Sequence, residues 1–174
     1  MHCLVIGRTL SGKTTFTEKK TKSINRLHGR KIIVLDPMLD KRWGEGIAPS
    51  DIFVTSNKQK FLQMVWNSKN CVVVVDEAGK MIGKYDDVMD ELATTGRHFG
   101  HKCFFITQRA KQISTTIRTQ CSEIAIFKQS KDDTKDLANE FVEPMINEAH
   151  TLAKGEFIYV RDGQAPEKLN VFEL

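Results

Sequence analysis

The 174-residue sequence lacks the features that mark membrane, secreted and zinc-binding proteins. It has no run close to the ~20 consecutive apolar residues that a transmembrane helix requires, so no membrane span is predicted. Its first residues enter an apolar segment directly, without the basic stretch and cleavage site of a signal peptide. The four cysteines, Cys3, Cys71, Cys103 and Cys121, do not have the spacing of metal ligands. We therefore expect a soluble cytosolic protein whose cysteines are reduced thiols in the core.

Linkers, internal repeats and low-complexity segments are also absent, which predicts one domain that spans residues 1–174. Hydrophobic residues make up 40% of the chain and charged residues 28%, as in ordinary globular proteins. The formal net charge of +4 suits an anionic partner but does not identify one. Fold and function must therefore be inferred from local patterns.

Seven apolar segments of strand length recur along the chain. Most are continuous rather than alternating with polar residues, as in strands buried on both faces of a sheet. They are HCLVI (2–6), KIIVLD (31–36), DIFVT (51–55), CVVVVD (71–76), KCFFIT (102–107), EIAIF (123–127) and EFIYV (156–160). Polar segments with helical spacing predict helices at 13–28, 58–67, 86–98 and 132–141. The alternation predicts an α/β fold with a mostly parallel sheet flanked by helices.

Two details of this fold can be predicted more finely. The last segment reads as a strand, a turn at Asp162-Gly163 and a second strand, and such a short connection joins antiparallel strands. We therefore expect an antiparallel edge at the C-terminal end of the sheet. In the helix at 58–67, the spacing of Phe61, Met64 and Val65 predicts that these three side chains share its inner face.

A phosphate-binding loop lies between the first strand and the first helix. Residues 7–14, GRTLSGKT, match G-x-x-x-x-G-K-[ST] at every fixed position. The glycines let successive backbone N–H groups point at an anion, and the start of the helix adds its positive dipole end. We expect Lys13 to reach the β- and γ-phosphates and the hydroxyl of Thr14 to bind Mg²⁺. The predicted nucleotide-binding residues are Gly7, Arg8, Thr9, Leu10, Ser11, Gly12, Lys13, Thr14 and Thr15.

An acidic pair follows the fourth apolar segment. Asp76 and Glu77 come directly after four valines, so a buried parallel strand would carry both carboxylates to the edge of the sheet where ligands bind. The first acid can support the Mg²⁺, and the second can polarise an attacking water. A small-molecule kinase does not need a water-activating base, whereas a hydrolytic motor does. The pair therefore favours hydrolysis.

A third polar tip, Thr107-Gln108, follows the segment KCFFIT. In a parallel sheet it would lie beside the phosphate loop, where Gln108 can touch both the attacking water and the γ-phosphate. The guanine-reading motif Asn-Lys-x-Asp is incomplete, because NKQK at 57–60 lacks the aspartate. ATP is therefore preferred to GTP as the nucleotide.

These motifs occur in an order that resembles a known family. The phosphate loop, VLDP, VVVVDEAGKMI, GRHFGHKCFFITQRAKQIS and LAKGEFIYV together resemble the motor core of the FtsK–HerA superfamily of DNA-pumping ATPases, from Met1 to Val160. The resemblance implies a P-loop NTPase fold of the ASCE, RecA-like type, with Walker A and Walker B motifs. It also implies a homo-oligomeric ring, usually a hexamer and alternatively a pentamer, with ATP between subunits.

By the same resemblance, Arg97 is the arginine finger that acts on the ATP of the neighbouring subunit, with Arg118 as the second candidate. A guanidinium stabilises the charge that develops on the transferring γ-phosphoryl group. The compact chain is most similar to the minimal genome-packaging ATPases of membrane-containing icosahedral viruses. The stretch TLAKGEF is shorter than its counterpart in chromosomal translocases, so the choice of virus over chromosome depends on size alone.

Candidate DNA contacts come from two segments. The candidates are Lys80 and Lys84 in the glycine-containing loop AGKMIGKYDD, and Lys41, Arg42 and Trp43 in DPMLDKRWGEG. Contacts to phosphates would be blind to sequence and sensitive to salt, as a pump requires. The basic residues of the first helix are interpreted as a solvated face.

Together these features predict an ATP hydrolase that translocates double-stranded DNA, as a viral packaging motor that fills a preformed capsid. Its expected cofactors are ATP and Mg²⁺, and its expected partners are DNA, further copies of the chain, and a capsid or portal-vertex protein. It would act in the host cytoplasm, in association with a virion vertex. Three alternatives stay open: a single-stranded DNA export or conjugative ATPase of the same superfamily, a nucleotide kinase, and a nucleotide-dependent scaffold without turnover, in which Glu77 would be idle.

Overall fold

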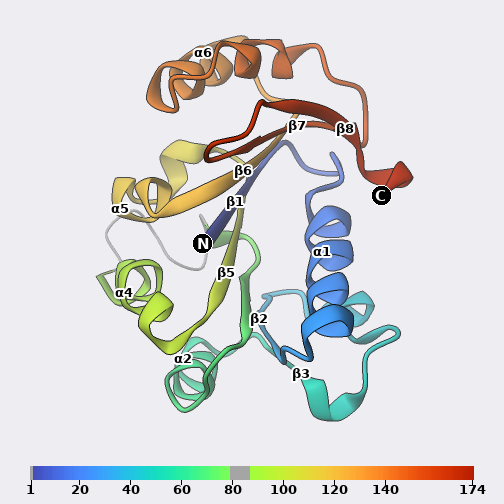
Figure 1. Cartoon of the computed structure of the whole chain (residues 1–174), viewed down its shortest axis with the longest axis vertical. Helices are drawn as coiled ribbons and strands as arrows, with labels where there is room; N and C mark the ends of the chain where they lie inside the picture. Colours follow the sequence, from blue (N-terminus) through green and yellow to red (C-terminus); the bar gives the residue numbers. More distant parts are fainter. Residues whose placement is uncertain (1, 79–86) are drawn as a thin grey trace.

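The computed structural model describes residues 2–78 and 87–174 (Figure 1). In these ranges, eight strands form one sheet in the order β3-β2-β4-β5-β1-β6-β7-β8. The strands are β1 (His2–Ile6), β2 (Ile32–Leu35), β3 (Ile52–Thr55), β4 (Val72–Val75), β5 (Lys102–Thr107), β6 (Cys121–Phe127), β7 (Glu156–Arg161) and β8 (Glu167–Asn170). The strands from β3 to β6 pair in parallel, and β7 and β8 add an antiparallel edge. The predicted fold class is confirmed.

The parallel register brings the carboxyl ends of the central strands to one edge. Ile6, the last residue of β1, pairs with Thr107, the last residue of β5, while Leu35 pairs with Val75 at the ends of β2 and β4. β8 runs parallel to β1, because two antiparallel pairings separate it from β6. The segments that follow β1, β2, β4, β5, β6 and β8 therefore all leave the sheet at this edge, which we call the carboxyl edge.

Helices cover both faces of the sheet. The α-helices are α1 (Lys13–His28), α2 (Lys58–Trp66), α4 (Asp87–Thr95), α5 (Thr115–Thr119) and α6 (Lys131–Glu140). The 3₁₀ helices are η1 (Lys41–Gly44), η2 (Pro49–Asp51), η3 (Gly96–Phe99), η4 (Ala110–Gln112), η5 (Pro144–His150) and η6 (Val171–Glu173). Figure 1 shows α1 on one side of the sheet and α2, α4 and α5 on the other. The sequence did not predict α5 or η5, which are short or irregular.

Local sequence explains where the helices begin and end. Gly12 precedes α1 with φ 114° and Gly29 follows it with φ 62°, both in the left-handed region that favours glycine. The side chains of Asn57, Ser114 and Ser130 accept hydrogen bonds from the backbone of the first turns of α2, α5 and α6. Such N-caps satisfy backbone donors that have no partner within the helix.

Two hydrophobic cores lie on the two faces of the sheet. On one face, Phe16 of α1 packs against the rings of Phe127, Phe157 and Tyr159. On the other, Phe61 and the other apolar residues of α2, α4, α5 and α6 pack on the central strands. The cores hold the central strands rigidly, so the side chains at their carboxyl ends have fixed positions.

Several expectations about single residues can now be compared with the structure. All four cysteines are free and buried, as predicted. The prediction for Met64 was wrong, because its side chain is 38% exposed while Phe61 and Val65 are fully buried. A step of four residues places Phe61 and Val65 on the same side of α2, and Met64 lies on its flank. In the described ranges, no helix is long and apolar enough to cross a bilayer.

Candidate active site

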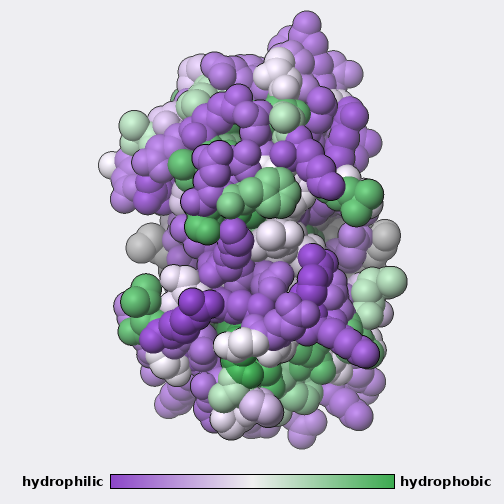
Figure 2. All heavy atoms as spheres, turned by 90° about the vertical axis from the view of Figure 1, so that its right-hand side faces the viewer, coloured by the Kyte–Doolittle hydropathy of each residue, from purple (hydrophilic) through white to green (hydrophobic). Residues whose placement is uncertain are grey.

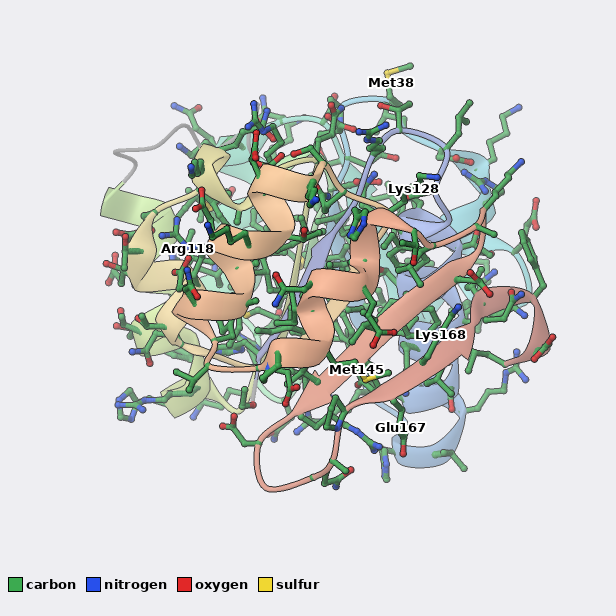
Figure 3. All side chains as sticks on the ribbon, turned by 90° about the horizontal axis from the view of Figure 1, so that it is seen from above. Met38, Arg118, Lys128, Met145, Glu167 and Lys168 are labelled. Atoms are coloured by element: carbon green, nitrogen blue, oxygen red, sulfur yellow. The ribbon has the colours of Figure 1, made fainter. Side chains whose placement is uncertain are left out.

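The phosphate loop is tied to the carboxyl edge by its backbone. Gly7 N donates to Thr107 O at 3.2 Å, and Arg8 N donates to Lys128 O at 3.2 Å. A Cβ on Gly7 would lie 2.5 Å from Cβ of Phe127 and 2.6 Å from Oγ of Ser11, so only glycine fits there. Figure 3 shows Lys128 and Met38 at the same end of the molecule. The loop is thus built into the edge where the strands end.

Lys13 turns back over this loop. Its Nζ donates to Arg8 O at 2.9 Å, and the residue is 7% exposed. Burial lowers the pKa of the Lys13 ammonium, and the negative charges of Glu77 and Asp76 oppose that shift. The cation therefore lies close to both acids, inside the cradle that the loop forms.

Thr14 and Asp76 face each other across the same cradle. Thr14 Oγ1 lies 3.4 Å from Asp76 Oδ2, and Asp76 Oδ1 accepts from Glu77 N at 2.8 Å. Burial raises the pKa of Asp76 to about 6, and the neighbouring carboxylates of Asp36 and Glu77 act in the same direction. A cation between these groups would relieve that electrostatic cost.

The chemistry of these donors fits a Mg²⁺–nucleotide. Mg²⁺ prefers oxygen ligands and is commonly held by one or two protein oxygens together with substrate phosphates. Among the described residues, no group of three or more His, Cys, Asp or Glu could hold a metal alone. The hydroxyl of Ser11 is buried in the cradle, and within the described ranges it has no hydrogen-bond partner. A phosphate oxygen would satisfy it, so Thr14, Asp76 and Ser11 all suit this ligand.

Glu77 and Gln108 meet at the ends of β4 and β5. Gln108 Nε2 donates to Glu77 Oε2 at 3.2 Å and lies 3.4 Å from Oε1. Glu77 has φ 50°, in the left-handed region that a non-glycine residue rarely adopts and that is often found at functional sites. Buried Gln129 donates from Nε2 to Gln108 O at 2.9 Å and fixes the backbone there. The structure thus brings together the two side chains that the sequence placed on separate strands.

One cleft of about 400 Å³ joins the phosphate loop to these acids. Its lining residues are Thr9, Leu10, Ser11, Gly12, Lys13, Thr14, Thr15, Asp36, Met38, Asp40, Arg42, Asp76, Glu77, Lys154 and Phe172. The sequence motifs did not predict Asp36, Met38, Asp40, Lys154 or Phe172 as site residues. Asp36 follows buried β2 as Asp76 follows β4, so the same signal could have identified it. Lys154 and Phe172 flank the antiparallel edge strands, where no motif marks them.

Asp36 organises the loop that follows β2. It is 2% exposed and accepts from Met38 N and Asp40 N, each at 2.8 Å. Its Oδ2 also accepts from Nε1 of Trp43 at 3.1 Å. The prediction that Trp43 contacts DNA was therefore wrong, because this side chain is 2% exposed and packs beneath the loop.

The other candidate DNA contacts have different positions. Arg42 pairs with Asp40 at 2.6 Å and lines the cleft, so it lies beside the predicted nucleotide. Lys41 is exposed on η1. Lys80 and Lys84 lie outside the described residues. The contacts stay predictions, and of the two cations on η1 it is Arg42 that is paired with a carboxylate.

The two candidate arginine fingers differ sharply. Arg118 pairs with Glu140 at 2.7 Å and donates to the carbonyls of Ile113 at 2.8 Å and Ala110 at 3.2 Å. Arg118 belongs to α5 and is labelled in Figure 3, and its guanidinium joins α5 to Glu140 at the end of α6. Arg97 is exposed on η3, and no described side chain hydrogen-bonds to it.

Arg97 also lies at the edge opposite the phosphate loop. η3 precedes Lys102, which pairs with the first residue of β4, and the charge of Arg97 influences His2 at the start of β1. A six-residue strand such as β5 is about 20 Å long, so Arg97 is far from the nucleotide cleft of its own chain. Arg97 therefore does not contribute to the nucleotide cleft of its own chain.

Comparisons with solved structures support the fold. B204, the DNA-packaging ATPase from Sulfolobus turreted icosahedral virus, matches with a TM-score of 0.76 and 19% identity over 96% of this chain and 95% of that one. B204 from Sulfolobus turreted icosahedral virus 2 in complex with sulfate gives 0.78 and 16% over 95% and 94%. The type VII secretion ATPase EccC of Thermomonospora curvata gives 0.67 and 12% over 97% and 25%.

These similarities confirm the predicted P-loop ATPase fold. No curated protein sequence matches the chain significantly. The family model described as zonular occludens toxin (Zot) matches residues 3–134, which is more than half of the sequence. The chain therefore belongs to the Zot family.

Proposed function

We propose that this protein hydrolyses ATP and uses the energy to translocate double-stranded DNA, as a motor that packages a viral genome into a preformed capsid. The observation that carries the proposal is the convergence of Lys13, Asp76 and Glu77 at one cleft, where Gln108 is hydrogen-bonded to Glu77. The similarity to B204 over nearly the full length of both chains supports the packaging role. B204 has also been solved with ATPγS and with AMPPCP, which supports a nucleotide as ligand.

Each residue has a role that follows from its place in the cleft. The backbone N–H groups of residues 7–15 and the ammonium of Lys13 bind the phosphates. Thr14 and Asp76 hold Mg²⁺, which when bound neutralises charge on the phosphate oxygens. Glu77 accepts a proton from the attacking water, and Gln108 orients that water. A protein that lacks either Glu77 or Gln108 should still bind the nucleotide but hydrolyse it slowly.

Arg97 completes the site on a neighbouring subunit in this proposal. Arg97 is exposed and lies at the edge of the sheet opposite the phosphate loop. This position suits a head-to-tail ring in which that edge of one subunit meets the nucleotide cleft of the next. A guanidinium supplied in trans couples hydrolysis to assembly. A hexamer is the proposed ring, with a pentamer as the alternative, and a capsid or portal-vertex protein is the proposed partner. The motor would act in the host cytoplasm, at the vertex of the assembling virion.

ATP turnover tests the proposal directly. Purified protein is assayed at low salt, with and without long double-stranded DNA, beside Glu77→Gln and a matched control. Glu91→Gln makes the same chemical change on α4 at an exposed position outside the cleft. We expect stimulation by DNA in the wild type and the control, and its loss in Glu77→Gln. Turnover that ignores DNA, with phosphoryl transfer to a small acceptor, would replace the motor with a kinase.

A further inference from the structure

Phe172 is an exposed aromatic residue at the rim of the nucleotide cleft. Its side chain lines the cleft together with Lys154, and the residue is 61% exposed. Figure 2 views the side of the molecule that carries α1 and shows a mainly hydrophilic surface with separate hydrophobic patches. Because ligand clefts are commonly lined by aromatic side chains, an exposed aromatic ring at the rim of this cleft is a candidate ligand contact.

Contacts of Phe172 and of its two neighbours fix this segment, although Phe172 is the third residue from the end of the sequence. The ring of Phe172 packs closely against Gly155, where a Cβ would come within 2.4 Å of Cε2. Asn170 Oδ1 accepts from Phe172 N at 3.0 Å, and Val171 is fully buried. Lys19 of α1 donates to the carbonyls of Val171 at 2.9 Å and Leu174 at 3.1 Å. The aromatic face is therefore preorganised.

The same segment is joined to the phosphate loop. Gly155 N donates to Ser11 O at 3.0 Å, and Val171 N donates to Gly155 O at 2.8 Å. A Cβ on Gly12 would meet Val171 Cγ1 at 3.1 Å. The phosphate loop, Gly155 and the segment that carries Phe172 are thus joined by hydrogen bonds and close packing. Figure 1 shows the C-terminal end beside the start of α1.

The order of the strands tells which end of the nucleotide faces Phe172. Glu77 and Gln108 follow β4 and β5, which lie on one side of β1 in the sheet. Phe172 follows β8, which lies on the other side of β1, beyond β6 and β7. The γ-phosphate must lie near the acids that support its hydrolysis. The opposite end of the nucleotide, which is the base, then extends towards Phe172.

We propose that Phe172 is the platform on which the purine base of ATP stacks, an assignment that depends on the proposed nucleotide function. Aromatic rings bind bases through their π-faces without reading hydrogen-bond patterns, and such stacking contributes substantially to affinity. Arg42 also lines this cleft, and its planar guanidinium is a second group on which a base can stack. The C-terminal segment is thereby part of the nucleotide site.

The test compares ligands with and without a base. Equilibrium dissociation constants for Mg²⁺–ATP, Mg²⁺–CTP and Mg²⁺–tripolyphosphate are measured by calorimetry for the wild type, Phe172→Ala, Phe172→Tyr and Leu174→Ala. Leu174 is the matched control, because it is an exposed apolar residue of the same segment that does not line the cleft. Tripolyphosphate occupies the phosphate loop but offers nothing to stack.

We expect Phe172→Ala to weaken ATP binding about tenfold and tripolyphosphate binding less than about twofold. Phe172→Tyr and Leu174→Ala should bind ATP like the wild type, and CTP, with its smaller ring, should bind more weakly than ATP. Equal losses for ATP and tripolyphosphate in Phe172→Ala, or no loss for either, would overturn the inference while leaving the proposed function intact. A wild-type protein that binds neither ligand would overturn both.

Discussion

Nε2 of Gln108 lies 3.2 Å from Oε2 of Glu77, so the ends of β5 and β4 are joined by a direct hydrogen bond. This bond orients the carboxylate that we propose as the base and places an amide next to it. Gln108 also has its own backbone fixed, through the 2.9 Å bond from Gln129 Nε2 to its carbonyl. A group held this way can respond to a γ-phosphate without reorganising at the moment of reaction.

Replacement of Gln108 by alanine should lower ATP turnover about a hundredfold, because the loss of one preorganised polar group costs about that much in comparable sites. The affinity for Mg²⁺–ATP should change less than about threefold, since Lys13 and the loop bind the phosphates. Steady-state turnover and a dissociation constant provide the two readouts. Gln63→Ala, on the exposed side of α2, is the matched control. Normal turnover in Gln108→Ala would show that the hydrogen bond is structural.

Replacing the two candidate arginine fingers by alanine should affect turnover in one case and stability in the other. Arg97→Ala should keep its thermal stability and lose turnover by about a thousandfold, as expected of an arginine finger. Arg26→Ala, an exposed cation on α1, should change neither. Mixing Arg97→Ala with Lys13→Ala subunits should restore part of the turnover, because some interfaces then combine an intact Lys13 with an intact Arg97. A mixture as inactive as its components would argue against action in trans.

Arg118→Ala should instead lower the free energy of unfolding. Its guanidinium is largely buried and satisfies the carbonyls of Ala110 and Ile113 as well as Glu140. Leaving such groups without partners costs about 2–4 kcal/mol. Urea denaturation measures this loss. An Arg118→Ala protein as stable as the wild type would contradict the structural role that we assign.

Asp76 carries an electrostatic cost that its replacement should relieve. Its pKa is raised to about 6, so the folded state binds a proton more tightly than the unfolded state, where the value is 3.8. The contribution of Asp76 to stability therefore falls as the pH rises from about 4 to about 6, by at most about 3 kcal/mol, and stays lower above that.

Asp76→Asn should consequently melt at a higher temperature than the wild type at pH 8 without Mg²⁺ or nucleotide, with the difference shrinking towards pH 4. It should also lose turnover, because the amide no longer supports the metal. Calorimetric scans across this pH range provide the measurement. A variant that is less stable than the wild type at pH 8 would show that the hydrogen bonds of the carboxylate outweigh its burial.

His2 gives the opposite pH dependence. Burial lowers its pKa from 6.5 to about 4, and the charge of Arg97 acts in the same direction. Between these two pH values His2 is protonated in the unfolded chain but neutral in the folded state. The free energy of unfolding therefore decreases as the pH falls from about 6.5 towards 4, by at most about 3 kcal/mol. His2→Asn keeps an acceptor for Cys103 N and should lose less stability over this range. Equal acid sensitivity in both proteins would contradict this account.

The fold followed from the sequence because continuous runs such as the four valines before Asp76 leave little alternative to a buried parallel strand. The phosphate loop and the acids at strand ends could be predicted for the same reason, since motif and strand direction together fix an edge. Glu77 and Gln108 were expected at one edge, and the structure places them in contact.

What the sequence could not show depends on long-range packing. Phe172 and Lys154 reach the cleft only because β8 runs parallel to β1 and Gly155 bonds to Ser11. Trp43 looked like a surface aromatic among cations, but the buried carboxylate of Asp36 binds its indole. Both Arg118 and Arg97 were candidate arginine fingers in the sequence, and only the carbonyls that surround Arg118 in the folded chain distinguish the two.

Strand displacement from a triplex tests the central claim most directly. A labelled third strand is bound at one end of a long DNA duplex, and its release is followed after ATP is added to the wild type and to Glu77→Gln. We predict that release of the third strand requires ATP and does not occur with Glu77→Gln. The lag before release should lengthen as the duplex that the protein must cross becomes longer. ATP hydrolysis by the wild type without any release of the third strand would contradict the account of this protein as a DNA translocase.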